Sequence, residues 1–335
     1  MQVSGNGLCT MSTRYIPELD GLRAIAAIAV VAFHTRLPGL SGGFLGVDVF
    51  FVLSGYLTAS IALSGKYDLA GFMIRRLRRL WPLLICACLS VSLVAALFGG
   101  MTAAEVVPGA FFLGNISVAF FGTHGPLAHT WTLGNEMQFY AIVATLAIFL
   151  SRRSFRGVCV ALFMTSTISR LTYGYLGEWV LGYYSPFAHS SGLFAGALIA
   201  TLPIDRYGKP APLFMLASSS ILTAFALARF QSTEALLFWT SVVEFSTAGL
   251  IVAVSSGAGA IASILRTPLM RSLGCLSYGV YLWHYPIAVW FRNAFEPLTA
   301  FALTISTSLI LATLSYHLVE RPGRMSLRRP VVAVS

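Results

Sequence analysis

Long apolar stretches alternate with short polar or glycine- and proline-containing breaks along almost the whole chain. A helix needs about 20 mostly apolar residues to cross the hydrocarbon core of a bilayer. By that criterion the sequence predicts an all-α polytopic membrane protein with about ten transmembrane helices. The expected spans are 14–36, 43–65, 79–99, 135–151, 155–171, 179–201, 212–229, 234–255, 275–293 and 297–319.

Three ionisable residues interrupt the first two apolar stretches: Arg23, His34 and Asp48. An ionisable group at membrane depth is costly, so its presence indicates a functional site with a partner nearby. Arg23 and His34 are separated by about 1100° of helix rotation, roughly 20° from three full turns, and by about 16 Å along the axis. They therefore share a face with the small side chains of Ala27 and Val30. This face is predicted to line a narrow slot for a thin, flexible acyl carrier arm. A snorkelling arginine and a structural histidine are the alternative.

A short connection rich in glycine and proline, residues 38–43, joins these two spans and makes them antiparallel neighbours. Asp48 is therefore expected at the depth of His34. A carboxylate beside an imidazole fixes its tautomer and raises its basicity, so His34 and Asp48 are predicted to form a catalytic pair. A helix-capping aspartate is the alternative. Ser54 and Tyr56 follow in the same span and can form hydrogen bonds across helices.

Four arginines and no lysine occur just before Trp81 and Pro82. The pattern predicts a cytoplasmic turn, where topology alone favours some positive charge. The planar guanidinium group of arginine, however, also suits bidentate contacts to phosphate, which indicates a phosphate-bearing cytosolic ligand. The residues concerned are Arg75, Arg76, Arg78 and Arg79.

Polar and aromatic residues gather at two later positions, 129–140 at the start of the fourth span and 277–286 in the ninth, where Pro286 can kink the helix. Aromatic faces combined with amide and carboxylate groups suit a carbohydrate ligand. An aromatic belt or a purely structural role explains some of them equally well. The candidates are Trp131, Asn135, Glu136, Gln138, Tyr140, Tyr281 and His284.

Composition supports a membrane protein. Of the 335 residues, 57% are hydrophobic and only 10% are charged, whereas soluble domains carry about 25% charged residues. The expected organisation is an unstructured N-terminal segment (1–13) without a cleavable signal peptide, a transmembrane domain (14–322) and a basic cytoplasmic tail (323–335). Met11 offers an alternative start. The five cysteines show no disulfide spacing and are expected to be small packing residues.

The formal net charge of +10 does not indicate nucleic acid, because its distribution follows the positive-inside rule. With the N-terminus in the cytoplasm, every Lys and Arg falls in an inside segment except Arg36, Arg170, Arg229 and Arg292. The long outer connection 100–134 contains neither residue type. An even number of spans then places both termini in the cytoplasm.

Together these motifs resemble the integral-membrane acyltransferase-3 family, whose bacterial members O-acylate cell-surface glycans. The resemblance rests on residues 17–56, the arginines at 75–79, residues 131–140 and 277–286, and Glu320-Arg321-Pro322. It implies a multi-pass protein of the bacterial inner membrane that moves an acetyl group from cytosolic acetyl-CoA to a glycan or glycolipid hydroxyl on the far side. It implies acyl-CoA as donor substrate, no permanently bound cofactor and no metal. A glycan-assembly protein is an expected partner.

The resemblance also implies roles for individual residues. His34 is similar to the family's essential histidine, Arg23 to its first-span arginine and Asp48 to the acid of its second span. Glu136 matches the glutamate of the family's Trp-Ser-Leu segment. The donor site is then expected to comprise Arg23, Arg75, Arg76, Arg78, Arg79, Ser54 and Tyr56, and the acceptor site the later polar and aromatic candidates.

The chain departs from the family pattern at three positions. Thr132 replaces the usual serine, which is a mild change. His189 and Gly192 stand where many members carry arginine and glutamate, which weakens an acceptor assignment to the sixth span. Some members also carry an external hydrolase-like domain, which these residues do not include, so the chain is expected either to finish the transfer alone or to use a partner.

Two other functions remain open from the sequence. In a transporter or channel, the buried His, Asp and Arg residues would form a proton or solute path. The missing internal repeats and paired broken helices argue against it. In a non-catalytic sensor or scaffold, the same polar residues would be structural. Whether the acyl group first rests on a nucleophile such as Ser54 is also open.

Overall fold

The computed structural model describes residues 15–64, 68–98, 103–204, 211–257 and 259–321, and every regular element in them is helical. The predicted N-terminal segment 1–13, Cys9 and the tail 323–335 lie outside the described residues. The elements, in chain order, are α1 (Pro17–His34), η1 (Gly43–Leu45), α2 (Gly46–Ala62), α3 (Leu69–Phe98), α4 (Ala103–Ala110), α5 (Gly114–Phe121), η2 (Ala128–Thr130), α6 (Trp131–Phe149), α7 (Arg152–Leu176), α8 (Trp179–Tyr184), α9 (Ser191–Ile199), α10 (Ala211–Leu227), η4 (Ala235–Trp239), α11 (Thr240–Ser255), η5 (Gly259–Arg266), α12 (Pro268–Ala294), α13 (Pro297–Ser315) and η6 (Tyr316–Glu320).

Local sequence signals fix the ends of several helices. Proline stands in the first turn of α1, α12 and α13, where its missing N–H costs nothing. Ser151 caps α7 by accepting a hydrogen bond from the Ser154 N–H, and α7 ends at Gly177, whose φ of 77° is left-handed. These signals explain why the predicted and observed ends of α1 and α13 nearly coincide.

The all-α prediction is confirmed. Within the described ranges, four helical stretches are long and apolar enough to cross a membrane: Gly43–Ala62, Leu69–Leu97, Ala235–Ser255 and Pro297–Glu320. Helix α10 is a shorter apolar helix. The count of ten spans and the cytoplasmic location of both termini stay predictions.

Two predicted boundaries are wrong. The arginines at 75–79 were expected in a turn, but α3 begins at Leu69 and carries them inside one continuous helix. Leu, Met and Arg are good helix formers, and the charge pattern alone does not show where a helix begins. The predicted span 179–201 is two short helices, α8 and α9, because the chain leaves helical geometry at Ser185, just before Pro186.

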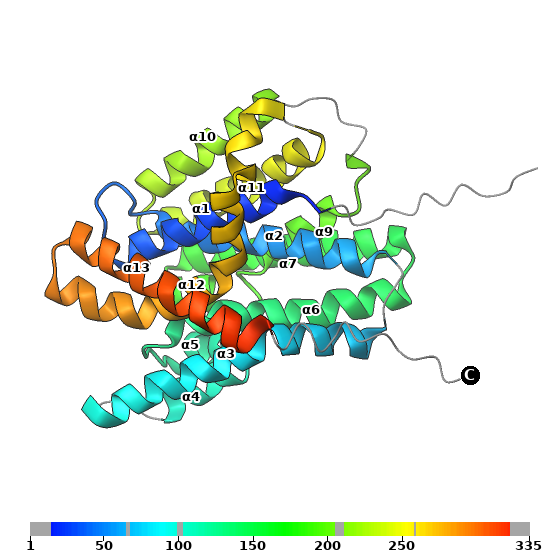
Figure 1. Cartoon of the computed structure of the whole chain (residues 1–335). Coiled ribbons are helices and arrows are strands. Elements are labelled where there is room, and N and C mark those ends of the chain that lie inside the picture. The colour runs from blue at the N-terminus through cyan, green and yellow to red at the C-terminus, as the bar shows by residue number, and fades with distance from the viewer. Residues whose placement is uncertain (1–14, 65–67, 99–102, 205–210, 258, 322–335) are drawn as a thin grey trace, which may run out of the picture.

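The described part of the connection predicted to lie outside, residues 103–134, contains further helices. It contains α4 and α5 and leads through η2 into α6, which begins at Trp131 rather than at residue 135. In Figure 1 these short helices lie with α3 at one edge of the bundle, and α10 and α11 lie at the opposite edge. Helices α1, α2 and α6 run between those edges.

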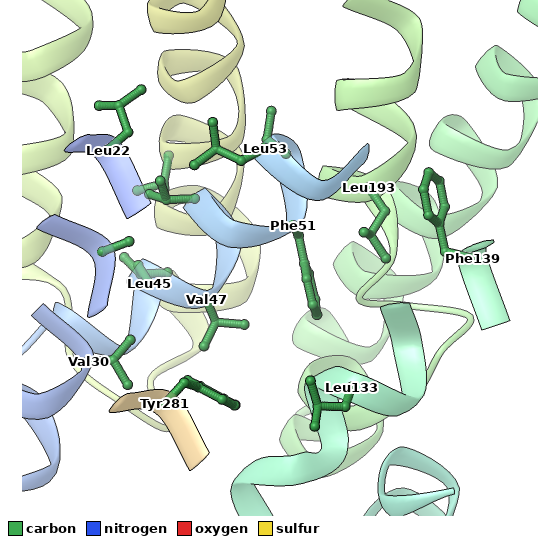
Figure 2. Close-up of a cluster of buried hydrophobic side chains, with 14 of the residues drawn as sticks. Leu22, Val30, Leu45, Val47, Phe51, Leu53, Leu133, Phe139, Leu193 and Tyr281 are labelled. Atoms are coloured by element: carbon green, nitrogen blue, oxygen red, sulfur yellow. The ribbon is translucent and has the colours of Figure 1, made fainter. Parts of the chain in front are cut away.

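Helix α2 is the centre of the fold. It packs against α1, α6, α9 and α11, and 72% of its membrane-length window is buried. Figure 2 shows Val47 and Phe51 projecting from α2 towards Tyr281 of α12 and Leu133 of α6. Side chains on different faces of α2 therefore contact different helices, so α2 can bring polar groups from several helices close together.

Candidate active site

An electropositive cavity lies where α1, α2, α3, α6 and α12 meet. Three guanidinium groups, those of Arg23, Arg76 and Arg79, face it together with one carboxylate, that of Glu136. With the space at its open mouth it measures about 740 Å³. We name it the arginine cavity. Its other lining residues are Val47, Phe50, Phe51, Ser54, Leu57, Leu80, Thr132, Leu133, Tyr140, Ser277, Tyr278 and Tyr281.

Aromatic rings and hydroxyls hold the arginines in place. The Arg76 guanidinium carbon lies 4.8 Å from the ring centre of Tyr140 and 5.3 Å from that of Phe72. Its Nη2 donates to Thr58 Oγ1 at 3.3 Å. Stacking fixes the guanidinium plane while leaving N–H groups free to bind an anion.

The other two guanidinium groups reach the cavity from different helices. Arg23 Nε donates to Ser277 Oγ at 3.3 Å, and its guanidinium carbon lies 5.7 Å from the Phe50 ring centre. Arg79 Nε is buried and has no hydrogen-bond partner among the described residues. Unpaired buried donors are rare and invite a ligand.

A hydrogen-bonded chain crosses the same cavity from α2 to α6. Tyr140 donates to Glu136 Oε2 at 2.8 Å. Because a hydroxyl has one proton, Ser54 must be the donor in its 2.8 Å contact with the Tyr140 hydroxyl. Glu136, Tyr140 and Ser54 therefore line the same cavity as the three arginines, and the predicted assignment of Glu136 and Tyr140 to an acceptor group stays a prediction.

Only half of the arginine cluster faces this cavity. Arg76 and Arg79 are one turn apart on α3 and line it, whereas Arg75 and Arg78 are exposed and do not. Tyr56 lines neither this cavity nor the second one described below, and is partly buried against the hydrophobic core.

A second cavity lies at the C-terminal end of α1. Aromatic side chains from η1, α6, α8 and α12 dominate it, and with its mouth it measures about 760 Å³. We name it the aromatic cavity. Its lining residues are Phe33, His34, Phe44, Val47, Ala128, His129, Trp131, Tyr183, Tyr184, Phe230, Tyr281, Tyr285 and Arg292.

The hydrogen bonds of His34 identify its tautomer. His284 Nδ1 lies 2.6 Å from the Tyr281 carbonyl oxygen, which can only accept, so neutral His284 carries its proton on Nδ1. Its Nε2 is then an acceptor for His34 Nδ1, 3.2 Å away, and the Val30 carbonyl accepts from the same His34 atom at 2.9 Å. Since Nδ1 holds the proton, the lone pair of His34 lies on Nε2, which is the state a general base needs.

Two residues, Val47 of α2 and Tyr281 of α12, line both cavities. Thr132 Oγ1 donates to the Tyr281 hydroxyl at 2.8 Å, and that hydroxyl donates to the His129 carbonyl at 2.5 Å. Tyr281 is thereby held in place at the boundary. The slot expected beside Ala27 and Val30 is not part of either lining; the two cavities instead lie next to each other, with Val47 and Tyr281 in both linings.

A family model described as an acyltransferase domain matches residues 16–317, which include every lining residue of both cavities. This chain belongs to that acyltransferase family. The resemblance inferred from the motifs is therefore confirmed.

Two relatives show how far the similarity extends. YrhL of Bacillus subtilis strain 168, provisionally named a peptidoglycan O-acetyltransferase, is 31% identical over 353 residues, covering 94% of this chain and 56% of YrhL. The O-acetyltransferase OatA of Staphylococcus aureus strain NCTC 8325 is 30% identical over 352 residues, covering 93% of this chain and 58% of OatA. The chain thus spans a little over half the length of these relatives. No solved structure is significantly similar to it.

Within this family framework, the predicted pairing of His34 with Asp48 is wrong. Asp48 Oδ1 bonds His189 Nε2 at 2.7 Å, and both side chains are fully buried. His189 Nδ1 donates to the Tyr183 carbonyl at 2.6 Å. Asp48 follows Val47 directly, so it is turned by about 100° around α2, away from the cavities and towards the segment before α9.

A second buried ion pair stands beside the departures noted at His189 and Gly192. Arg170 of α7 contacts Glu244 of α11 at 3.3 Å, with both side chains almost completely buried. A Cβ atom on Gly192 would lie 3.4 Å from Glu244 Oε1. The Glu244 carboxylate therefore lies beside Gly192, and neither residue lines one of the two cavities.

Asn135 and Gln138 also have structural roles. The Asn115 amide donates to Asn135 Oδ1 at 2.5 Å and to Gln138 Oε1 at 2.9 Å, and Asn135 Nδ2 donates to the His189 carbonyl at 3.3 Å. Neither residue lines one of the two cavities.

Among the other acceptor candidates, Trp131 and Tyr281 line the aromatic cavity. His284 accepts a hydrogen bond from His34 Nδ1.

Sequence reasoning missed His129, Tyr285 and Arg292, all of which line the aromatic cavity. His129 Nε2 donates to the Leu282 carbonyl at 3.2 Å, so its Nδ1 is an acceptor, and that atom is buried without a partner among the described residues. Tyr285 lies inside the family motif 277–286, and His129 lies in the polar and aromatic stretch 129–140, which was the available signal. Arg292 was noted only as an exception to the charge distribution.

The three clustered histidines do not form a metal site. His129 and His284 each donate one ring nitrogen to a carbonyl, and His284 Nε2 faces His34 rather than an open position. Across residues 15–64, 68–98, 103–204, 211–257 and 259–321, no group of three or more His, Cys, Asp and Glu is arranged to hold a metal ion.

Proposed function

We propose that this chain is a membrane O-acyltransferase that moves an acetyl group from acetyl-CoA to a sugar hydroxyl. The observation that carries the proposal is the pair of cavities that meet at Val47 and Tyr281, one electropositive and one aromatic with His34 in its wall. Membership of the acyltransferase family and the names of YrhL and OatA support the reaction type.

Acetyl-CoA would bind through the arginine cavity. Its phosphate groups are multiply charged, and Arg76 and Arg79 offer guanidinium groups whose geometry suits phosphate oxygens. Arg23, whose guanidinium carbon lies 5.7 Å from the Phe50 ring centre, would contact the pantetheine arm together with Ser54. The arm would carry the thioester towards Val47 and Tyr281, where the cavities meet.

His34 would then act as general base. Its Nε2 takes the proton of the acceptor hydroxyl while the hydroxyl oxygen attacks the thioester carbonyl carbon, so that a C–O bond forms and the C–S bond breaks. The His34 imidazolium returns its proton to the departing CoA thiolate. Throughout, His284 and the Val30 carbonyl would hold Nδ1 protonated, so His284 would have the orienting role that was predicted for Asp48.

The positive-inside rule supports a placement of the two half-sites on opposite sides of the membrane. The arginine cavity would open to the cytoplasm, where acetyl-CoA is made, and the aromatic cavity to the far side of a bacterial inner membrane. The acceptor would then be a surface glycan or its lipid-linked precursor, supplied alone or by an assembly partner. In this arrangement Arg23, near the start of α1, would serve the donor and His34, at its end, would serve the acceptor.

The test uses inside-out membrane vesicles that receive acetyl-labelled CoA at the cytoplasmic face. The parent should transfer label to glycan, and the His34→Ala variant should lose at least about 100-fold of that rate, as general bases contribute this much or more. His317→Ala is the matched control, since His317 is exposed on η6 and lines neither cavity. Equal rates in the parent and in folded His34→Ala would refute the mechanism, and solute uptake without acyl transfer would favour a transporter.

A further inference from the structure

Arg292 lies at the edge of the aromatic cavity and forms no ion pair among the described residues. It lies in the last turn of α12, one of the few basic residues assigned to the outer side by charge distribution. Its Nε atom is buried, and no hydrogen bond or ion pair to it exists among the described residues. A position in the last helical turn makes a cation favourable there, but it leaves that donor unsatisfied.

The rest of the cavity offers this cation nothing to pair with. The lining contains no carboxylate, and aromatic rings and the imidazoles of His34 and His129 make up most of its wall. A snorkelling arginine directs its charged group to the membrane surface, whereas the buried Nε of Arg292 shows that part of its guanidinium faces inward. The cavity therefore combines flat aromatic faces, which suit a sugar ring, with one unmatched positive charge.

We propose that the acceptor is an acidic sugar, whose carboxylate or phosphate group pairs with Arg292 while one of its hydroxyls is presented to His34 Nε2. This inference rests on the proposed function and names the substrate class of the same site. The unpartnered His129 Nδ1 accepts a hydrogen bond from a second hydroxyl of that sugar.

The same arrangement discriminates against neutral sugars. Arg292 and His34 line one cavity and interact electrostatically. When His34 takes the acceptor proton it becomes a cation, and an unpaired Arg292 opposes that change. An anion on the substrate neutralises Arg292 and so favours the transition state, while a neutral sugar leaves the repulsion in place.

The experiment compares acceptors that differ only at C6 of one sugar: a methyl glucoside, the corresponding glucuronoside and the glucoside 6-phosphate. Transfer from acetyl-CoA is measured with purified protein in phosphatidylcholine vesicles for the parent, Arg292→Gln and Arg292→Lys. In the parent we expect kcat/KM for the better acidic acceptor to exceed that for the glucoside by about tenfold or more. This is the factor that one hydrogen bond to a charged group contributes to binding. Which acidic acceptor is better identifies carboxylate or phosphate as the natural group.

The variants give the decisive comparison. Arg292→Gln should bring the ratio close to one by slowing transfer to the acidic acceptor and speeding transfer to the neutral one, with Arg292→Lys in between. A ratio that Arg292→Gln leaves unchanged overturns the proposal. So does an effect of Arg292→Gln that appears only when phosphatidylglycerol is added to the vesicles, since Arg292 would then bind a lipid headgroup.

Equilibrium binding separates this inference from the proposed function. If even the parent transfers no acetyl group, the acyltransferase proposal fails, but the affinity for the three sugars still tests the cavity. Glucuronoside or 6-phosphate binding that exceeds glucoside binding in the parent, and that Arg292→Gln abolishes, supports an acidic ligand. Equal affinity for the three sugars in the parent overturns it.

Discussion

His284 sets the protonation state of His34, so its contribution can be measured separately from that of the base itself. The His284→Phe variant keeps an aromatic ring but cannot accept a hydrogen bond from His34 Nδ1. We expect kcat to fall by about tenfold while the KM for acetyl-CoA stays near that of the parent, because the Val30 carbonyl still holds part of the tautomer preference. Steady-state kinetics and a pH–rate profile check this.

The matched control for that variant is His317→Phe, at an exposed position on η6. It makes the same chemical change away from both cavities. A loss in His284→Phe as complete as in His34→Ala would assign His284 a direct part in proton transfer. An unchanged kcat in folded protein would remove it from the mechanism.

The arginine cluster provides an internal comparison on one helix. Arg76 lines the arginine cavity and Arg75, its neighbour in sequence, does not. We expect Arg76→Gln to raise the KM for acetyl-CoA by about tenfold, the usual effect of one charged hydrogen bond, and Arg75→Gln to change it by less than about twofold. Steady-state kinetics with varied acetyl-CoA measures both; similar losses in the two variants would show that the cluster acts only as a diffuse charge.

Residue identity and residue partnership differ in how well the sequence predicts them. Arg23, His34 and Asp48 could be singled out because ionisable side chains are rare in apolar helices. The partner of Asp48 could not, since Val47 and Asp48 are adjacent in sequence yet point to a cavity boundary and to His189. Which of them faces which neighbour depends on the rotation of α2, and an apolar sequence with polar groups on several faces does not define it.

At the scale of whole elements, the packing of α2 against α9 depends on two glycines. A Cβ atom on Gly55 would collide with the Leu193 carbonyl oxygen, and one on Gly196 would collide with the Val52 carbonyl oxygen. Gly55→Ala and Gly196→Ala should therefore each destabilise the fold by about 1–3 kcal/mol, the usual cost of overpacking. Thermal denaturation in detergent measures the loss.

The control for this pair is Gly157→Ala on α7, where a new Cβ atom meets nothing within 4 Å. Alanine has the higher helix propensity, so this variant should be neutral or more stable by up to about 1 kcal/mol. Destabilisation of all three variants to the same degree would mean that close approach of α2 and α9 is not what their glycines provide.

The sequence predicts the positions of long helices better than the positions where a predicted span breaks into two shorter helices. Apolar periodicity and terminal prolines place α1 and α13 within a few residues, because both signals are local. The break between α8 and α9 was missed because Ser185–Ser190 is as compatible with a polar patch in a span as with a loop. It is stabilised by tertiary contacts, among them the bonds of His189 to Asp48 and Tyr183, which no local pattern contains.

At the scale of the whole molecule, the two cavities meet at Val47, so the size of this one side chain should control passage between them. Val47→Phe narrows the meeting point. We expect it to lower kcat by at least about tenfold, since a displaced thioester loses alignment with the hydroxyl, while CoA affinity stays within about twofold. Val49→Phe is the control, because Val49 is equally buried on α2 but lines neither cavity.

The opposite substitution gives the sharper result. Val47→Ala removes two methyl groups at the meeting point without adding a charge or a polar group. It should let propionyl- and butyryl-CoA serve as donors, raising their kcat/KM relative to acetyl-CoA by about 10-fold, the discrimination expected of one or two methylene groups in an apolar site. Competition between acyl-CoA donors, followed by mass analysis of the product, measures this ratio. A different result would be an unchanged preference for acetyl-CoA in Val47→Ala together with an inactive Val47→Phe. Val47 would then be needed for the packing of α2 against α12, and it would not control the path of the acyl group.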